Sequence, residues 1–222
     1  PACGGDGRGW RHQAEQRRGA LIVSLVETLA PSLAPLHPES RETLTAAVEV
    51  ACRDNATATL HHLVTALAAE GGEYAAPIRA ALSELCSGPL SGMLDRPATT
   101  TPDPTAPIIA VGTAAVADND LAHTLAVLTA TSQLDAVAGP GRKLIIFDEA
   151  WRILATPTHL ARVNAELRLS RARGTSTILI THALSDTDKA ANAGTSAAAT
   201  ARGLVALCDT RIIFRQAPGE TD

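Results

Sequence analysis

The stretch Lys143–Trp151, with the sequence KLIIFDEAW, limits what this chain can fold into more than any other part of it. An unbroken apolar run, Leu144–Phe147, leads directly into two adjacent carboxylates. Such a run, without alternation, is typical of a strand covered on both faces, as in a parallel sheet flanked by helices. Acidic residues at the carboxyl end of such a strand lie at the edge where ligands bind. We therefore expect a buried strand with a functional site at its end.

The two carboxylates, Asp148 and Glu149, suggest nucleotide chemistry. In nucleotide hydrolases an aspartate at a strand end orients the Mg²⁺ that bridges phosphate groups, and a glutamate beside it polarises the attacking water. We assign the first role to Asp148 and the second to Glu149. The alternative is that both acids simply begin a helix, because the exposed N–H groups and the dipole of a first turn favour negative charge.

The order of patterns along the chain predicts a helical part followed by an α/β part. Residues 1–87 carry apolar side chains at helical spacing, whereas residues 88–107 are rich in Gly and Pro and are expected to form a surface loop. Residues 108–222 alternate between strand and helix patterns, which is the signature of a parallel sheet flanked by helices. The strands are expected at Pro107–Gly112, Leu144–Phe147, Thr175–His182 and Arg211–Gln216.

Composition excludes several classes of protein. The formal net charge is −4 and 45% of the 222 residues are hydrophobic, so the chain can bury one core and has no overall field that attracts nucleic acid. The four cysteines are widely spaced and are expected to be reduced thiols in a cytosolic protein. No apolar run is long enough to cross a bilayer. His61 and His62 point about 100° apart on a predicted helix, so we expect helix-surface or partly buried side chains rather than metal ligands.

Taken together, these motifs resemble one family. Four features in order resemble the TraC-type conjugation ATPases of type IV secretion, which belong to the HerA and FtsK-like branch of hexameric motor ATPases. These features are the DEAW core, an arginine-bearing helix after it, the strand ending Ile180–His182 and the final Ile212–Gln216. Ser87–Asp95 resembles the Gly-and-Phe/Leu stretch that precedes the Walker B strand in that family.

The resemblance implies a fold, cofactors and partners. It implies a RecA-like sheet, ATP and Mg²⁺ as cofactors, assembly into a homo-hexamer, and channel components of type IV secretion as partners, with DNA as an indirect partner. It also implies a cytoplasmic location, with attachment to the inner face of the cell membrane through those partners.

The resemblance also assigns roles to residues of the next strand. Asp148 would bind Mg²⁺ through its water shell and Glu149 would activate water. The family usually has Thr-Gln where this chain has Thr181-His182, and the Gln senses the γ-phosphate. A neutral imidazole can donate one hydrogen bond and accept one, so His182 can replace Gln as the γ-phosphate sensor. Unlike Gln, however, it makes this role dependent on pH.

Arginines complete the implied site. Arg171 and Arg173 match a basic pair of the family and Arg215 matches an arginine near the last strand; such residues bind phosphate oxygens, also across a subunit interface. The alternative for Arg171 and Arg173 is a cationic last helical turn favoured by the dipole. Arg215 can equally be an exposed strand-end charge, and Trp151 can be a core residue or part of a subunit contact.

One motif of the family is missing from the sequence. No G-x-x-x-x-G-K-[ST] loop occurs, and neither Lys143 nor Lys189 lies in a glycine loop that could hold phosphates. In the family this loop lies upstream, so we expect a C-terminal part of a longer ATPase that binds nucleotide weakly by itself. The alternatives are another DNA translocase or helicase of the RecA-like group, and a non-catalytic, truncated module that serves assembly.

Overall fold

The computed structural model describes most of the chain, and its contacts divide it into two compact units, Pro1–Ala138 and Gly139–Asp222. The described residues are 7–53, 57–100, 102–103, 105–137, 142–154, 160–161, 163–165, 167–168, 174–182, 203–204 and 206–215. None of the described helices is both long and apolar enough to cross a bilayer.

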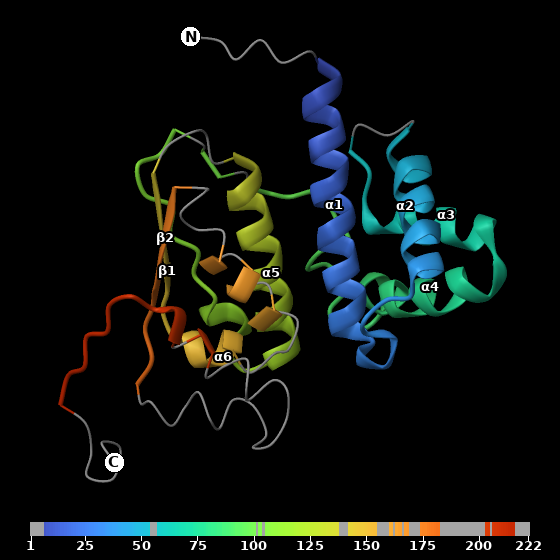
Figure 1. The fold of residues 1–222 in the computed structure, drawn as a ribbon. Helices are drawn as coiled ribbons and strands as arrows, with labels where there is room; N and C mark the ends of the chain where they lie inside the picture. Colours follow the sequence, from blue (N-terminus) through green and yellow to red (C-terminus); the bar gives the residue numbers. More distant parts are fainter. Residues whose placement is uncertain are drawn as a thin grey trace. The chain divides into compact units, whose positions relative to one another are not determined.

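The first unit is a bundle of helices (Figure 1). Helices α2, α3 and α4 pack against one another, and α1 contacts α2, α4 and α5. The elements are α1 (Gly7–Leu29), η1 (Pro31–Leu33), α2 (Pro38–Arg53), α3 (Leu60–Glu70), α4 (Gly72–Ser87), η2 (Ala114–Val116) and α5 (Asp120–Val137). The helices that the apolar spacing predicts in residues 1–87 are therefore confirmed.

The starts of two helices follow from their sequence. The Oδ1 atom of Asn119 accepts a hydrogen bond from the backbone N–H of Ala122 at 2.9 Å, which satisfies one of the N–H groups that a first turn leaves unpaired. At α3, the backbone N–H of Thr59 donates to the Nδ1 atom of His62 at 3.1 Å. His62 is thus a capping residue of its own helix.

The core of this unit consists of the apolar faces of these helices. Leu82 and Ile78 of α4 and Val26 of α1 are fully buried, as are Leu125 and Leu128 of α5. They belong to one cluster of buried side chains. The helical spacing of these residues places them on the inner faces, so burial of this stripe stabilises helices that short peptides of the same sequence would not hold.

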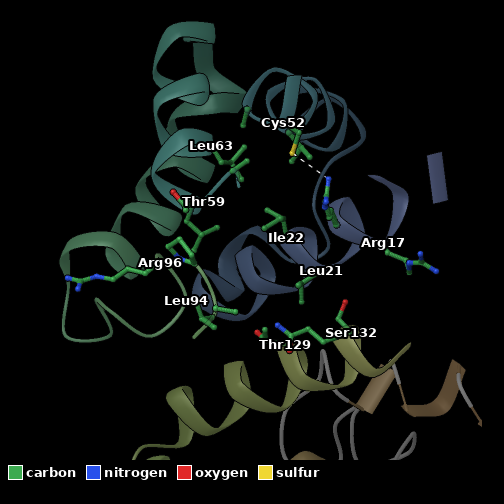
Figure 2. Close-up of a pocket in the computed structure, with 18 of the residues that line it drawn as sticks. Arg17, Leu21, Ile22, Cys52, Thr59, Leu63, Leu94, Arg96, Thr129 and Ser132 are labelled. Atoms are coloured by element: carbon green, nitrogen blue, oxygen red, sulfur yellow. Dashed lines mark hydrogen bonds between the residues drawn. The ribbon is translucent and has the colours of Figure 1, made fainter. Parts of the chain in front are cut away.

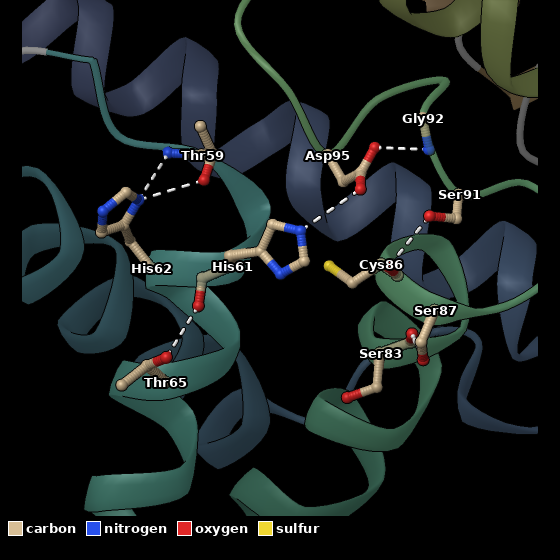
Figure 3. A network of polar contacts seen from close by, with 10 residues as sticks. All are labelled: Thr59, His61, His62, Thr65, Ser83, Cys86, Ser87, Ser91, Gly92 and Asp95. Atoms are coloured by element: carbon tan, nitrogen blue, oxygen red, sulfur yellow. Dashed lines mark hydrogen bonds and ion pairs between the residues drawn. The ribbon is translucent and has the colours of Figure 1, made fainter.

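The segment after α4 carries a buried acid where the sequence predicts a surface loop. The side chain of Asp95 is 2% exposed. Its Oδ1 atom accepts the backbone N–H of Gly92 at 2.7 Å, and its Oδ2 atom lies 3.2 Å from Nε2 of His61 on α3 (Figure 3). These contacts tie the loop to α3. Burial alone raises the pKa of the Asp95 carboxyl, but the backbone N–H groups of Gly92 and Asp95 and the contact with His61 outweigh it, so the pKa is lowered.

We expect the stability of the helical unit to fall in acid, and we expect Asp95 to cause part of that fall. Because the pKa of Asp95 is lower in the native state than in the unfolded chain, its ionised carboxylate stabilises the native state at pH values above the ordinary carboxyl pKa. This stabilisation is lost as the pH falls through the lower native-state pKa. Asp95→Asn should flatten the acid limb of a plot of urea midpoint against pH, measured by circular dichroism. The exposed Asp118→Asn is the control and should keep the parent's acid limb; an Asp95→Asn protein that also keeps it contradicts the assignment.

The second unit contains a small parallel sheet. β1 (Lys143–Phe147) pairs with β2 (Thr175–Leu179), with Ile145 opposite Thr177, and the short helix α6 (Ala150–Leu154) follows β1 (Figure 1). The described strands are these two alone. Both lie where the sequence predicts strands.

The predicted fold class is wrong. The structure is mostly helical, and a two-stranded sheet does not fit a RecA-like parallel sheet flanked by helices. Residues 107–112 and 211–215, which the sequence predicts as strands, have no regular secondary structure. Ile108 is 83% exposed and Phe214 is 81% exposed. An apolar run becomes a strand only when a neighbouring strand pairs with it and covers its side chains, and among the described residues neither run is part of a strand.

The expected burial of β1 on both faces is also wrong. Burial alternates along the strand, and Leu144 and Ile146 are 59% and 55% exposed. On β2 the neighbouring Ile178 is 42% exposed. One face of the sheet is therefore apolar and open among the described residues, which is why the unbroken apolar run was misleading about burial.

Candidate functional site

The site is a tight turn at the carboxyl end of β1. Asp148 and Glu149 form the turn between β1 and α6, and Glu149 has φ +54°. The backbone N–H of Ile180 donates to the carbonyl oxygen of Phe147 at 2.9 Å. The backbone N–H of Ala150 donates to the carbonyl oxygen of Ile180 at 2.8 Å. The backbone ladder therefore continues past both strands and holds the turn. The left-handed region is uncommon for a residue with a side chain, and such conformations cluster at functional sites.

Two side chains contact the carboxylate of Glu149. The indole Nε1–H of Trp151 donates to its Oε2 atom at 2.5 Å, and Nε2 of His182 lies 2.6 Å from its Oε1 atom. Trp151 lies in the first turn of α6, and His182 lies three residues after the end of β2. Parallel pairing of β1 and β2 brings both strand ends to the same edge, so residues far apart in sequence meet there.

The pKa of Glu149 is lowered. The hydrogen bond from Trp151 is the largest cause; desolvation opposes it, and the hydrogen bond and charge of His182, with the charge of Arg152, add to the lowering. The Arg152 guanidinium carbon also lies 5.7 Å from the centre of the Trp151 ring, a cation–π contact. Glu149 is consequently an ionised carboxylate at neutral pH.

We expect Trp151→Phe to raise the pKa of Glu149 toward the ordinary value of a glutamate, because Phe keeps the ring but has no N–H to donate. The pKa is measured from the carboxyl ¹³C shift of Glu149 as a function of pH. His182→Ala should also raise it, since the hydrogen bond and the charge of His182 both lower the pKa. A Glu149 pKa that does not move in Trp151→Phe would rule out the indole as its main stabiliser.

Asp148 directly precedes Glu149 in the sequence, and Thr181 directly precedes His182. Asp148 is exposed, and its Oδ1 atom accepts the backbone N–H of Glu149 at 3.0 Å. Carboxylate oxygens suit Mg²⁺, which keeps most of its own waters. Thr181 is half-buried directly before His182. Within the part of the chain that the structure describes, no three His, Cys, Asp or Glu residues are grouped so that they could enclose a metal ion.

Of the three predicted arginines, the structure describes Arg215 alone. Arg171 and Arg173 lie outside the described residues. Arg215 is exposed in a segment without regular secondary structure, so the predicted strand that would position it is not formed. His182, predicted to sense the γ-phosphate, contacts Glu149 through its Nε2 atom.

Trp151 is the site residue whose role the sequence did not predict. It was expected in the core or at a subunit contact, but its N–H binds the glutamate two residues earlier. The one available signal was chemical, because a partly buried indole N–H usually finds an acceptor and the nearest acid was Glu149.

Comparisons of the whole chain with known protein families, with curated proteins and with solved structures found no match.

Proposed function

We infer that this chain supplies the water-activating carboxylate of an ATP-hydrolysing motor of a conjugative transfer or type IV secretion system. One observation carries the proposal. The ionised carboxylate of Glu149 projects from a left-handed turn at the shared edge of two parallel strands, held by Trp151 and His182. An ionised carboxylate fixed at a strand end is suited to orient and polarise an attacking water.

The chemistry of the residues is consistent with that role. Each oxygen of a carboxylate has about two acceptor sites, and Trp151 and His182 occupy one on each oxygen. A water molecule can therefore still donate to Glu149. When bound, ATP would supply the phosphoryl group, and Mg²⁺ would neutralise charge on the phosphates. Asp148 would hold the hydrated Mg²⁺, and Thr181 and His182 would lie beside the phosphate that is transferred.

The proposal requires groups that hold the phosphates. Because the sequence has no G-x-x-x-x-G-K-[ST] loop, this loop would come from a segment outside these 222 residues. Arg171 and Arg215 would serve phosphate oxygens in a homo-hexamer. Channel components would be the partners at the inner face of the cell membrane, with DNA as indirect cargo. Loss of ATP hydrolysis in Glu149→Gln tests the assignment, and unchanged hydrolysis contradicts it.

A second candidate is a non-catalytic module that serves assembly. The missing phosphate loop favours it, as does the open apolar face of the sheet, which has the character of a surface that another protein covers. The gene sequence upstream of the Pro1 codon separates the two candidates. An in-frame Gly-rich GK[ST] loop supports the ATPase, whereas a start codon without such a loop supports the module.

A further inference from the structure

The helical unit contains a cavity of about 540 Å³ that is unrelated to Glu149. Its walls come from α1, α2, α5, the start of α3 and the loop 93–98, all of which belong to the first unit. Sites for small molecules usually have volumes of about 300–1,000 Å³ and a mainly apolar lining. This cavity has that size, and most of the residues that line it are apolar.

The apolar part of the cavity is aliphatic. Leu21 and Ile22 of α1, Leu63 of α3 and Leu94 of the loop line it (Figure 2). None of the described lining residues is Phe, Tyr or Trp. A nucleobase or other flat ring therefore has no aromatic face to stack on, whereas a flexible alkyl chain can fill an irregular aliphatic surface.

The charges of the cavity all have one sign. Arg17, Arg18 and Arg96 line it, and no Asp or Glu does so among the described residues. In Figure 2, Arg17 and Arg96 lie on opposite sides of the cavity, with their guanidinium groups directed outward to its exposed rim. Arg18 extends over the wall of the cavity, with Nη1 3.9 Å from the Sγ atom of Cys52. Clustered cations beside an apolar wall raise the local positive potential, and the planar guanidinium group matches a carboxylate or a phosphate.

We propose that this cavity binds a single-chain amphiphile with an anionic head group, a fatty carboxylate or an alkyl phosphate. The alkyl chain lies against Leu21, Ile22, Leu63 and Leu94, and Arg18 binds the head group. Arg17 and Arg96 attract the anion without needing to touch it. This activity is separate from nucleotide hydrolysis and does not depend on it.

The test is a calorimetric titration of the whole 222-residue chain with dodecanoate and with dodecyl phosphate, each below its critical micelle concentration. Saturable one-to-one binding of either is expected, and the tighter of the two identifies the head group. Dodecyltrimethylammonium has the same chain with a cationic head and should bind at least roughly tenfold more weakly, since a charge-assisted hydrogen bond is replaced by repulsion. Equal binding of the cation, or no saturable binding of either anion, overturns the proposal.

Substitutions locate the binding site. Arg18→Gln should weaken anion binding roughly tenfold, while Arg79→Gln on the exposed side of α4, outside the cavity, should leave it unchanged. Ser132→Trp, from the α5 wall, should abolish binding by filling the space. Unchanged binding in both Arg18→Gln and Ser132→Trp would overturn the assignment to this cavity, as would displacement of the amphiphile by Mg²⁺-ATP.

A measurement on the unsubstituted protein covers the case in which Ser132→Trp fails to fold. Cys52 lines the cavity, so bound amphiphile should slow its alkylation, followed by mass spectrometry. Cys208 belongs to the other unit and is the internal reference, whose rate should stay constant. Equal rates for Cys52 with and without saturating amphiphile contradict the proposal.

Discussion

Glu149→Gln is expected to lower steady-state ATP turnover roughly a hundredfold or more while leaving ATP binding intact, because proton transfer by a positioned side chain contributes about 10²–10⁴-fold. Gln keeps the size and the acceptor oxygen of Glu149 but cannot take a proton from water. Asp148 remains to hold hydrated Mg²⁺. Hydrolysis is measured by phosphate release, and binding by titration of a fluorescent ATP analogue with Mg²⁺.

The protein for this test must carry the phosphate-binding loop that the 222 residues lack. The control is Glu70→Gln, which changes an exposed glutamate at the end of α3, outside the site. Its turnover should equal that of the parent. Parent-level turnover in Glu149→Gln would eliminate Glu149 as the water-activating group. Absence of turnover in the parent itself, with the loop present, would favour the assembly module.

Leu82→Ala is expected to destabilise the helical unit by about 2–5 kcal/mol, the usual cost of emptying a fully buried leucine site. Leu82 has no exposed surface and belongs to the cluster formed by helices α1 to α5. Domains of ordinary size have only about 5–15 kcal/mol of stability, so this is a large share. Urea unfolding followed by circular dichroism measures the loss as a lower midpoint.

The control for this substitution is Val50→Ala on α2, whose side chain is 49% exposed. It should change the free energy of unfolding by less than about 0.5 kcal/mol, as surface substitutions usually do. If Leu82→Ala unfolds at the same urea concentration as the parent, the packing of α4 against the rest of the bundle is not as described.

The helices and the end of β1 could be predicted because their signals are local. Apolar spacing predicts the faces of α2 and α4, and Asp118 or Asn119 as a capping residue predicts the start of α5, where the structure shows Asn119 in that role. Likewise, the two acidic residues directly after Phe147 predict that β1 ends there and that a polar site follows. These features depend on residues within a few positions of one another.

The parallel sheet could not be predicted in the same way. The apolar runs at 107–112 and 211–215 have the composition of strands, yet neither forms a strand among the described residues. Whether a run becomes a strand depends on such partners, which single-sequence patterns do not show. For the same reason, the apolar run of β1 indicated burial on both faces, although Leu144 and Ile146 are exposed.

The sequence by itself determined where the helices of the first unit lie and that Asp148 and Glu149 follow a strand, since backbone preference and apolar spacing act over short distances. Only the tertiary structure decided that His182 meets Glu149, that Asp95 is buried against His61, and that arginines surround an aliphatic cavity. Those contacts join segments far apart in the chain. Their geometry depends on strand pairing and helix packing, which are properties of the folded whole.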